Sequence, residues 1–354
     1  MALSRPTALK APSRYAALLL AHLEREGHDC TELLQRVGVT RRALNHPQGL
    51  MHHTRLMALG RELLALANRS DSGLVVGEAL AFEHPPELGE AMRACATVGE
   101  ALHCLDRHHD VLTQAFGFRF RVKEDCAELR WFPAHPVVYD IVIFTFDVAM
   151  ASFHTWLTRV LRKTPPAYEV HCSLHLSVEG ARYDILSPAR LCFGEGGLPD
   201  LRIQVPLSLL EVPMPHADDA LRARMEAQLL AVRPGNDGPQ DRVAWLRLML
   251  RNARSHQPTQ AELADVLGVS VSTLSRQLGE QGYSFRTLAN EVRHEQACEL
   301  LRAGAMTVQD VATLQGYAEP ANFVRAFRAM AGVSPGVYAR QRRAGELLPP
   351  DPAS

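Results

Sequence analysis

The C-terminal third of the chain contains two copies of one helical pattern, and this repeat constrains the fold more than any other feature. Thr259 and Glu262 precede the run "LADVL". At an offset of 48 residues, Thr307 and Asp310 precede the run "VATL". Both pairs match the capping box that opens an α-helix. We therefore expect two helices with equivalent starts inside one all-α region.

A small residue and a glycine follow each of these starts at the spacing of a helix-turn-helix. The segment Ala264–Gly268 matches Ala312–Gly316 at the same offset. A small side chain lets two helices cross closely, and glycine tolerates the backbone of a tight turn. Beyond the turn, Leu274–Leu278 (LSRQL) matches Phe323–Phe327 (FVRAF) with a shift of one residue. Each copy is predicted to be a helix, a short turn and a second helix.

The second helix of each copy is predicted to have one apolar and one polar face. In the first copy, Leu274 and Leu278 share a face because they lie four residues apart. The residues predicted to point away from it are Ser272, Ser275 and Arg276. In the second copy, the inward residues are Phe323, Phe327 and Met330, and the outward residues are Ala321, Asn322, Arg325 and Arg328. Faces that carry short donors and arginine suit the major groove of DNA.

A longer helical pattern, Phe285–Ala303, separates the two copies. At 1.5 Å per residue it spans roughly 28 Å, close to the roughly 34 Å that separates successive major grooves. The two second helices are therefore predicted to reach neighbouring grooves on one side of a duplex.

The region from Arg242 to Arg343, about 100 residues, resembles the DNA-binding domain of the AraC/XylS family of bacterial transcription regulators. The resemblance includes the closing pattern "FVRAF", then "GVSP" and Tyr338. It implies that the second helix of each unit reads the bases, through Ser272, Thr273, Ser275, Arg276, Pro320, Ala321, Asn322 and Arg325. Two positions depart from the pattern: Tyr317 stands where phenylalanine is usual, and His294 where leucine is common. We interpret His294 as an interior histidine.

The N-terminal part is predicted to be mixed α and β. Apolar periodicity indicates helices and alternation indicates strands. Helices are expected over 29–44, 54–68, 99–116 and 139–161, and strands over 116–122, 126–132, 168–176 and 189–194. The N-terminal part also resembles the "arabinose-binding" type of effector domain of ornithine-utilisation regulators, over the segments 33–39, 85–102 and 201–218. The fold class is therefore an α+β effector and dimerisation domain followed by an all-α domain with two helix-turn-helix units.

A segment rich in Pro, Gly, Asn and Asp sets the expected boundary between these domains. We expect an effector domain over 1–230, a linker over 231–241, a DNA-binding domain over 242–343 and a flexible tail over 344–354. Residues 236–345 carry 13 arginines and no lysine against 10 acidic residues. This excess of positive charge is small, and solvated helix faces explain most of it.

The sequence argues against several other kinds of chemistry. Seven scattered cysteines without a C-x-x-C pair favour a reduced, cytoplasmic chain. The apolar segment 137–153 contains Asp140 and Asp147, so it is expected to be a core or dimer-interface helix and not a membrane span. His171 and His175 share one side of a predicted strand, and "LHCLDRHHD" contains His103, Cys104, His108 and His109, but nothing completes a metal set. We expect no metal, no cofactor and no catalytic site.

Three classes of protein remain compatible with these features. The first is a transcriptional regulator, expected to be an activator, that binds double-stranded promoter DNA and a small-molecule effector, forms a homodimer and contacts RNA polymerase. The second is a constitutive DNA-binding protein whose N-terminal domain only oligomerises. The third is an enzyme domain fused to a DNA-binding module.

Overall fold

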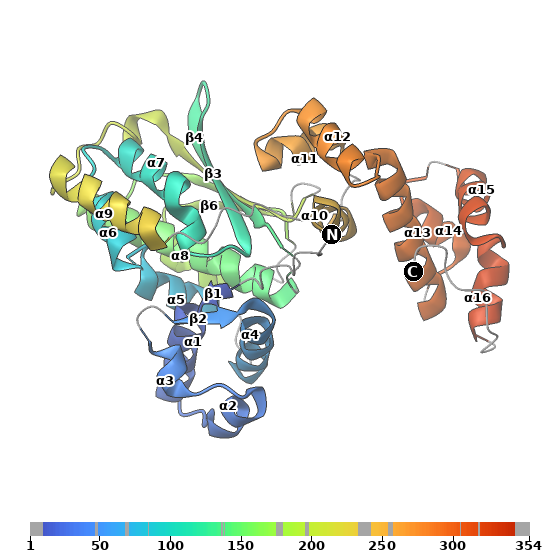
Figure 1. The fold of residues 1–354 in the computed structure, drawn as a ribbon, viewed down its shortest axis with the longest axis horizontal. Coiled ribbons are helices and arrows are strands. Elements are labelled where there is room, and N and C mark those ends of the chain that lie inside the picture. Colours follow the sequence, from blue (N-terminus) through green and yellow to red (C-terminus); the bar gives the residue numbers. More distant parts are fainter. Residues whose placement is uncertain are drawn as a thin grey trace, which may run out of the picture. The chain divides into compact units, whose positions relative to one another are not determined.

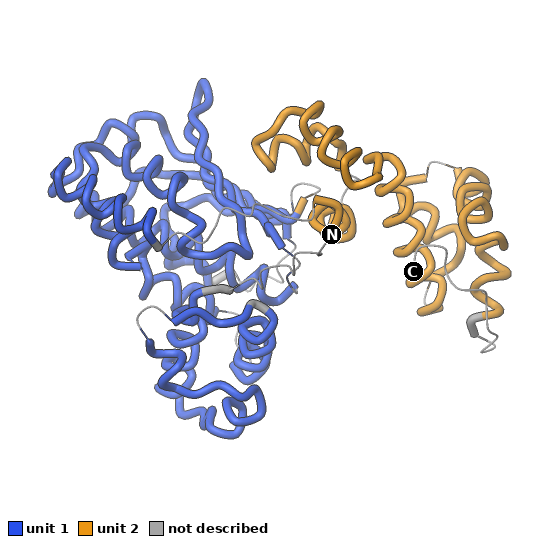
Figure 2. The backbone as a smooth tube through the Cα atoms, viewed as in Figure 1, with its two compact units in different colours: residues 1–195, 199–238 blue, residues 196–198, 239–354 orange. Residues whose placement is uncertain are grey.

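The computed structural model describes residues 10–46, 49–67, 71–83, 85–135, 137, 139–174, 180–194, 198–232, 242–253, 258–304, 306–317 and 319–343. The chain divides into two compact units, residues 1–195 with 199–238, and residues 239–354 with 196–198 (Figure 2). Most of the predicted linker, residues 233–241, and the predicted tail, residues 344–354, lie outside the described residues. The last helix of the first unit continues through Val232, slightly into the predicted linker.

The first unit combines helices with two sheets (Figure 1). Its α-helices are α1 (Arg14–Arg25), α2 (Thr31–Val37), α3 (Arg41–Leu44), α4 (His53–Ala67), α5 (Ser72–Leu80), α6 (Pro86–Arg93), α7 (Val98–His108), α8 (Tyr139–Leu161) and α9 (Asp219–Val232). Short 3₁₀ helices are η1 (His109–Val111), η2 (Gly180–Leu186) and η3 (Leu207–Leu209). The strands are β1 (Lys10–Pro12), β2 (Leu50–His52), β3 (Phe116–Val122), β4 (Cys126–Pro133), β5 (Glu169–Cys172), β6 (Arg190–Phe193) and β7 (Leu201–Pro206).

The main sheet has the strand order β3-β4-β7-β5-β6, antiparallel except for the β5–β6 pair. Alternation along β3 buries Phe116, Phe118 and Phe120 on one face. These rings pack against the helices that cover that face: Phe116 against Phe146 of α8, and Phe120 against His103 of α7. The period-2 pattern of the sequence therefore positions the core as predicted.

α8 is the central helix of the first unit. It has 23 residues, and by length and composition it is the one helix in the described part of the chain that could cross a membrane. Most of its apolar stretch is buried inside the unit instead, which confirms the predicted core helix. Glycines let α5 approach α8 closely, because a Cβ on Gly77 would lie 2.4 Å from the carbonyl oxygen of Val148. The hydroxyl of Ser152 on α8 donates to the carbonyl of Gly77 at 2.9 Å.

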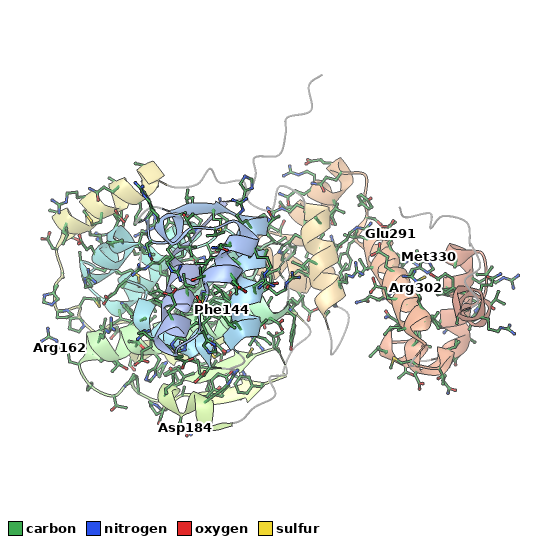
Figure 3. All side chains as sticks on the ribbon, turned by 90° about the horizontal axis from the view of Figure 1, so that it is seen from below. Phe144, Arg162, Asp184, Glu291, Arg302 and Met330 are labelled. Atoms are coloured by element: carbon green, nitrogen blue, oxygen red, sulfur yellow. The ribbon has the colours of Figure 1, made fainter. Side chains whose placement is uncertain are left out.

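A second apolar cluster joins the N-terminal helices to the far side of α8. Leu19 and Leu23 of α1 pack with Leu59 and Leu63 of α4, and all four are buried. Phe144, on α8, packs against this cluster and lies among its side chains in Figure 3. The N-terminal helices are thus anchored on the same helix that supports the sheet.

The second unit contains only helices among its described residues, as predicted. They are α10 (Arg242–Asn252), α11 (Gln260–Leu267), α12 (Val271–Glu280), α13 (Phe285–Ala303), α14 (Val308–Leu314), α15 (Pro320–Ala331) and α16 (Pro335–Arg343). α13 has the predicted bounds, and its two ends carry the α11–α12 pair and the α14–α15 pair (Figure 1).

Three sequence predictions for the first unit were wrong in part. The helix expected over 29–44 is split into α2 and α3 by Gly38, whose φ of 69° is left-handed. The helix expected over 99–116 ends at His108 because η1 and then β3 follow. The alternation that predicted strands also missed β7, which pairs with both β4 and β5 in the middle of the sheet.

Candidate nucleic-acid interface

The first helix-turn-helix consists of α11, a glycine turn and α12. Thr259 Oγ1 accepts from the Glu262 backbone N–H at 3.2 Å, and the Glu262 carboxylate accepts from the Thr259 N–H at 2.6 Å. This completes the predicted capping box. Gly268 ends α11 with a φ of 67°, and Ser270 caps α12 by accepting from the Thr273 N–H at 3.1 Å. Local hydrogen bonds thus fix the start of both helices.

The apolar face of α12 is fully buried and its opposite face is exposed. Leu274 and Leu278 have no exposed surface. Ser272, Ser275 and Arg276 are exposed, so the structure places them on one outer face as predicted. The Ser275 hydroxyl accepts from Gln260 of α11 at 2.7 Å, and Arg276 Nε lies 3.9 Å from Glu280. A polar surface of this kind can exchange its internal contacts for contacts to a ligand.

Thr273 differs from the other predicted residues of α12. It is only half-exposed, and its hydroxyl forms a 2.8 Å hydrogen bond with the Ser270 hydroxyl. The Ser272 hydroxyl also lies 2.8 Å from Ser270. Ser270 was not among the predicted site residues, although its place before the helix marks it as an N-cap.

The second helix-turn-helix consists of α14, a glycine turn and α15. Thr307 and Asp310 form the second capping box, with a distance of 2.9 Å from the Thr307 N–H to the carboxylate. Hydrogen bonds from the Thr307 side chain and backbone hold the pKa of Asp310 below its ordinary value. Gly316 follows α14 with a φ of 78°. Pro320 is the first residue of α15, where its missing N–H costs no helical hydrogen bond.

Phe323 and Phe327 hold α15 on the body of the unit. Both are buried, and Phe327 contacts Phe323, Tyr338 and His294 with ring centroids 5.7, 5.4 and 4.8 Å away. Met330, predicted to pack inward with them, is only half-buried near the end of the helix.

The outer face of α15 carries the predicted residues of the second copy. Pro320, Ala321, Asn322 and Arg325 are all exposed. The Arg325 guanidinium donates to the Asn322 side-chain oxygen, which lies one turn earlier. The four residues therefore form one surface, but only two of them offer side-chain hydrogen-bonding groups.

His294 is buried on α13, as interpreted from the sequence. Its Nε2 lies 3.5 Å from Cys298 Sγ, and its ring packs on Phe327. The histidine thus helps to join α13 to the recognition helix α15.

Two arginines of the second unit have a structural use that the sequence analysis missed. Arg247 of α10 donates to Glu291 and to Glu295 (2.9 Å) of α13, and Arg251 donates to Glu299. Glutamates four residues apart lie on one helix face, so this spacing was a readable signal. These ion pairs fix α10 on α13, whereas Arg276 and Arg325 remain exposed on α12 and α15.

Comparison with known proteins assigns both units. A family model described as "Arabinose-binding domain of AraC transcription regulator, N-term" matches residues 27–197, and a helix-turn-helix domain model matches residues 263–341. The chain is an AraC-type transcriptional regulator.

Full-length relatives agree with this assignment. An uncharacterized HTH-type transcriptional regulator of Mycobacterium tuberculosis is 27% identical, over 92% of this chain and 96% of its own length. The ornithine utilization regulator of Pseudomonas aeruginosa is 24% identical, over 94% of this chain and 97% of its own. Among solved structures, the crystal structure of the transcriptional regulator CdpR from Pseudomonas aeruginosa aligns with a TM-score of 0.39 at 21% identity, covering 80% of this chain and 90% of that one, and this score is too low to add support to the assignment.

The regulator's N-terminal unit brings together a set of polar side chains that the sequence only partly indicated. Cys104 and His108, one turn apart on α7, meet Glu226 of α9 with ligand atoms within 4.8 Å of one another. Arg107 donates to Glu226 at 2.9 Å, and Arg222 lies 3.7 Å from the same oxygen. Two guanidinium groups already balance this carboxylate, which opposes binding of a further cation.

The other histidine pair proposed from the sequence is only half described. His171 of β5 is half-buried, 3.3 Å from Glu169. His175 lies outside the described residues.

Proposed function

We propose that this AraC-type regulator reads one asymmetric DNA site with α12 and α15, and that a small effector held by the N-terminal unit controls this binding. The observation that carries the proposal is the repeated geometry of the second unit. In each copy a buried apolar pair holds the second helix, whose opposite face is exposed; Ser270 caps α12, whereas α15 begins with Pro320 and has no side-chain cap.

The eight predicted residues contribute differently within this proposal. Arg276 and Arg325 are the candidates for bidentate contact to guanine, because the guanidinium fork matches its O6 and N7 atoms. Ser272, Ser275 and Asn322 supply shorter hydrogen-bonding groups. Thr273, Pro320 and Ala321 contribute shape, since the Thr273 hydroxyl is engaged in the cap and the other two have no side-chain donor. The first helix-turn-helix, α11–α12, therefore carries more of the specificity.

The test measures sequence preference rather than affinity alone. Binding sites are selected from random duplexes with the full chain, and then with Arg276→Ala and Arg325→Ala. Each substitution is expected to relax discrimination at a separate position by about 1–3 kcal/mol. Arg276→Lys and Arg325→Lys are the matched controls, because lysine retains the charge for a phosphate contact but loses the fork.

Two outcomes contradict this assignment. If an alanine variant keeps the wild-type preference and binds all sequences more weakly, that arginine contacts phosphate and not a base. If the half-site occupied by one chain is itself a short palindrome, the reading of one asymmetric site by a single chain is wrong, because α12 and α15 present different side chains.

The remaining features of the proposal extend beyond the DNA contacts. We infer a cytoplasmic homodimer that activates transcription through RNA polymerase, with an effector domain over 1–230 and a DNA-binding domain over 242–343. Sedimentation of the full chain tests the dimer, and transcription in vitro with purified polymerase tests activation. A regulator that binds its site equally well with and without every candidate effector would be constitutive.

A further inference from the structure

A narrow apolar cavity lies inside the N-terminal unit, between α1, α4 and α8. Its walls include Tyr15 and Leu19 of α1, Met57 of α4, and Ile141 and Phe144 of α8. Its volume is about 70 Å³, and the free space grows to about 620 Å³ when the open mouth is counted. The enclosed part of the cavity is therefore small, and the cavity is open to solvent.

A second cavity adjoins the first. Tyr15, Thr113, Phe116 and Thr145 line both of them, so these four side chains form a common wall. The second cavity, of about 30 Å³, continues towards Trp131 of β4. We expect a rotation of the Phe116 or Tyr15 ring to join the two spaces, and we call the joined space the channel.

The polar groups of the walls are few, uncharged and mostly engaged. The Thr145 hydroxyl donates to the Ile141 carbonyl at 2.7 Å, and the Ser152 hydroxyl donates to Gly77 at 2.9 Å. The Thr113 hydroxyl accepts from the Ala115 N–H at 3.0 Å. No Asp, Glu, Lys or Arg is present among the described residues that line either cavity.

The two titratable side chains in the walls are neutral near pH 7. Burial, with a smaller effect of Arg119, lowers the pKa of His109 to about 3, so its imidazole carries no charge. Burial raises the pKa of the Tyr15 phenol, so it remains a neutral donor. Within the described contacts, neither the Tyr15 hydroxyl nor the His109 ring forms a side-chain hydrogen bond, so both can bind a polar atom of a ligand.

This lining excludes strongly polar ligands. A sugar would leave most of its hydroxyls without partners, and a buried hydroxyl without a hydrogen bond is strongly unfavourable. An amino acid would bring two charges, and a buried charge needs a partner of opposite sign. Apolar walls with a few polar groups instead fit a hydrocarbon ligand.

We infer that these adjoining cavities are the effector site of the regulator and that they bind an alkyl or acyl chain, with any charged head group left at the mouth. The inference rests on the proposed function, because it identifies the ligand class of the proposed effector domain. Such a chain would contact both the N-terminal helices and α8, two parts of the unit that otherwise meet through the second apolar cluster.

Neutral linear alcohols, from butanol to dodecanol, are suitable probes of the full chain. Affinity, measured by calorimetry and by the rise in thermal midpoint, is expected to increase about fourfold per added methylene until the channel is full. Arabinose and ornithine are expected to leave the midpoint unchanged. Alcohol affinity that does not depend on the length of the alkyl chain would overturn the inference. A thermal midpoint that rises with arabinose or ornithine but not with the alcohols would also overturn it.

Substitutions in the common wall separate this site from non-specific binding. Thr145→Leu fills the channel and is expected to weaken octanol binding at least about tenfold, because the leucine occupies space that the ligand needs. Thr145→Val is the matched control, since it removes the hydroxyl but keeps the volume, and it should bind as the wild type does. Ala16→Leu, from the opposite wall, repeats the test if Thr145→Leu folds poorly. Wild-type octanol affinity in both leucine variants would refute the site.

A second measurement separates failure of the site from failure of the proposed function. Affinity for a selected DNA site is measured with and without octanol. Octanol that binds in the cavity but leaves DNA affinity unchanged contradicts effector control, and the site stands. If no alcohol binds while another compound alters DNA affinity, the cavity assignment falls and effector control stands.

Discussion

Replacing Phe327 by alanine is expected to disable the second DNA-reading helix although the side chain faces away from the predicted DNA surface. Phe327 is 2% exposed and contacts three other rings. Truncation of a buried phenylalanine costs about 3–5 kcal/mol. Among the described residues, the apolar cluster that contains Phe327 has seven other buried members, so this loss is large relative to the stability of α14–α16.

The expected result is local unfolding and not loss of the whole protein. Hydrogen exchange of the full-length variant should show loss of protection in α14–α16, with α11, α12 and the first unit still protected. A footprint on a selected site should shrink to the half read by α12. Ala329→Ser, at an exposed position of the same helix, is the control and should change stability by no more than about 0.5 kcal/mol.

Two results would refute this reasoning. Wild-type protection of α14–α16 in Phe327→Ala would mean that the surrounding rings close the cavity without loss of structure. A complete footprint in a variant with unprotected α15 would mean that this helix does not read DNA.

Two further predictions concern stability. Thr307→Ala removes the side-chain half of the second capping box and should destabilise α14 by about 1 kcal/mol. Thr307→Ser, the control, should be close to wild type. Equal rates of hydrogen exchange in α14 of the two variants would contradict this prediction. Burial, opposed by Arg182 and Tyr183, raises the pKa of Asp147 from 3.8 to about 7. The folded chain holds this proton more tightly than the unfolded chain. The stability that the protonated Asp147 side chain contributes is therefore present below about pH 4 and is lost as the pH rises to about 7. The thermal midpoint of Asp147→Asn should therefore rise relative to that of the wild type as the pH increases through this interval. A difference in midpoint between the two proteins that does not change with pH would exclude the effect.

Much of the DNA-binding unit could be predicted because its signals are local. A capping box joins residues three apart, and a buried helix face repeats every three or four residues. The bounds of α13 and both capping boxes followed from such patterns. The same logic failed at Gly38, where one left-handed glycine divides an otherwise continuous apolar pattern into two helices.

The sequence by itself determined the two helix-turn-helix units and the exposed faces of α12 and α15, since these depend on neighbours within one or two helical turns. Only the tertiary structure decided the position of β7 between β4 and β5, the ion pairs between α10 and α13, and the two adjoining cavities at Tyr15, Thr113 and Thr145. These features join segments far apart in the chain. Their partners are selected by how whole elements pack, and a one-dimensional pattern records which side of an element is apolar but not which other element covers it.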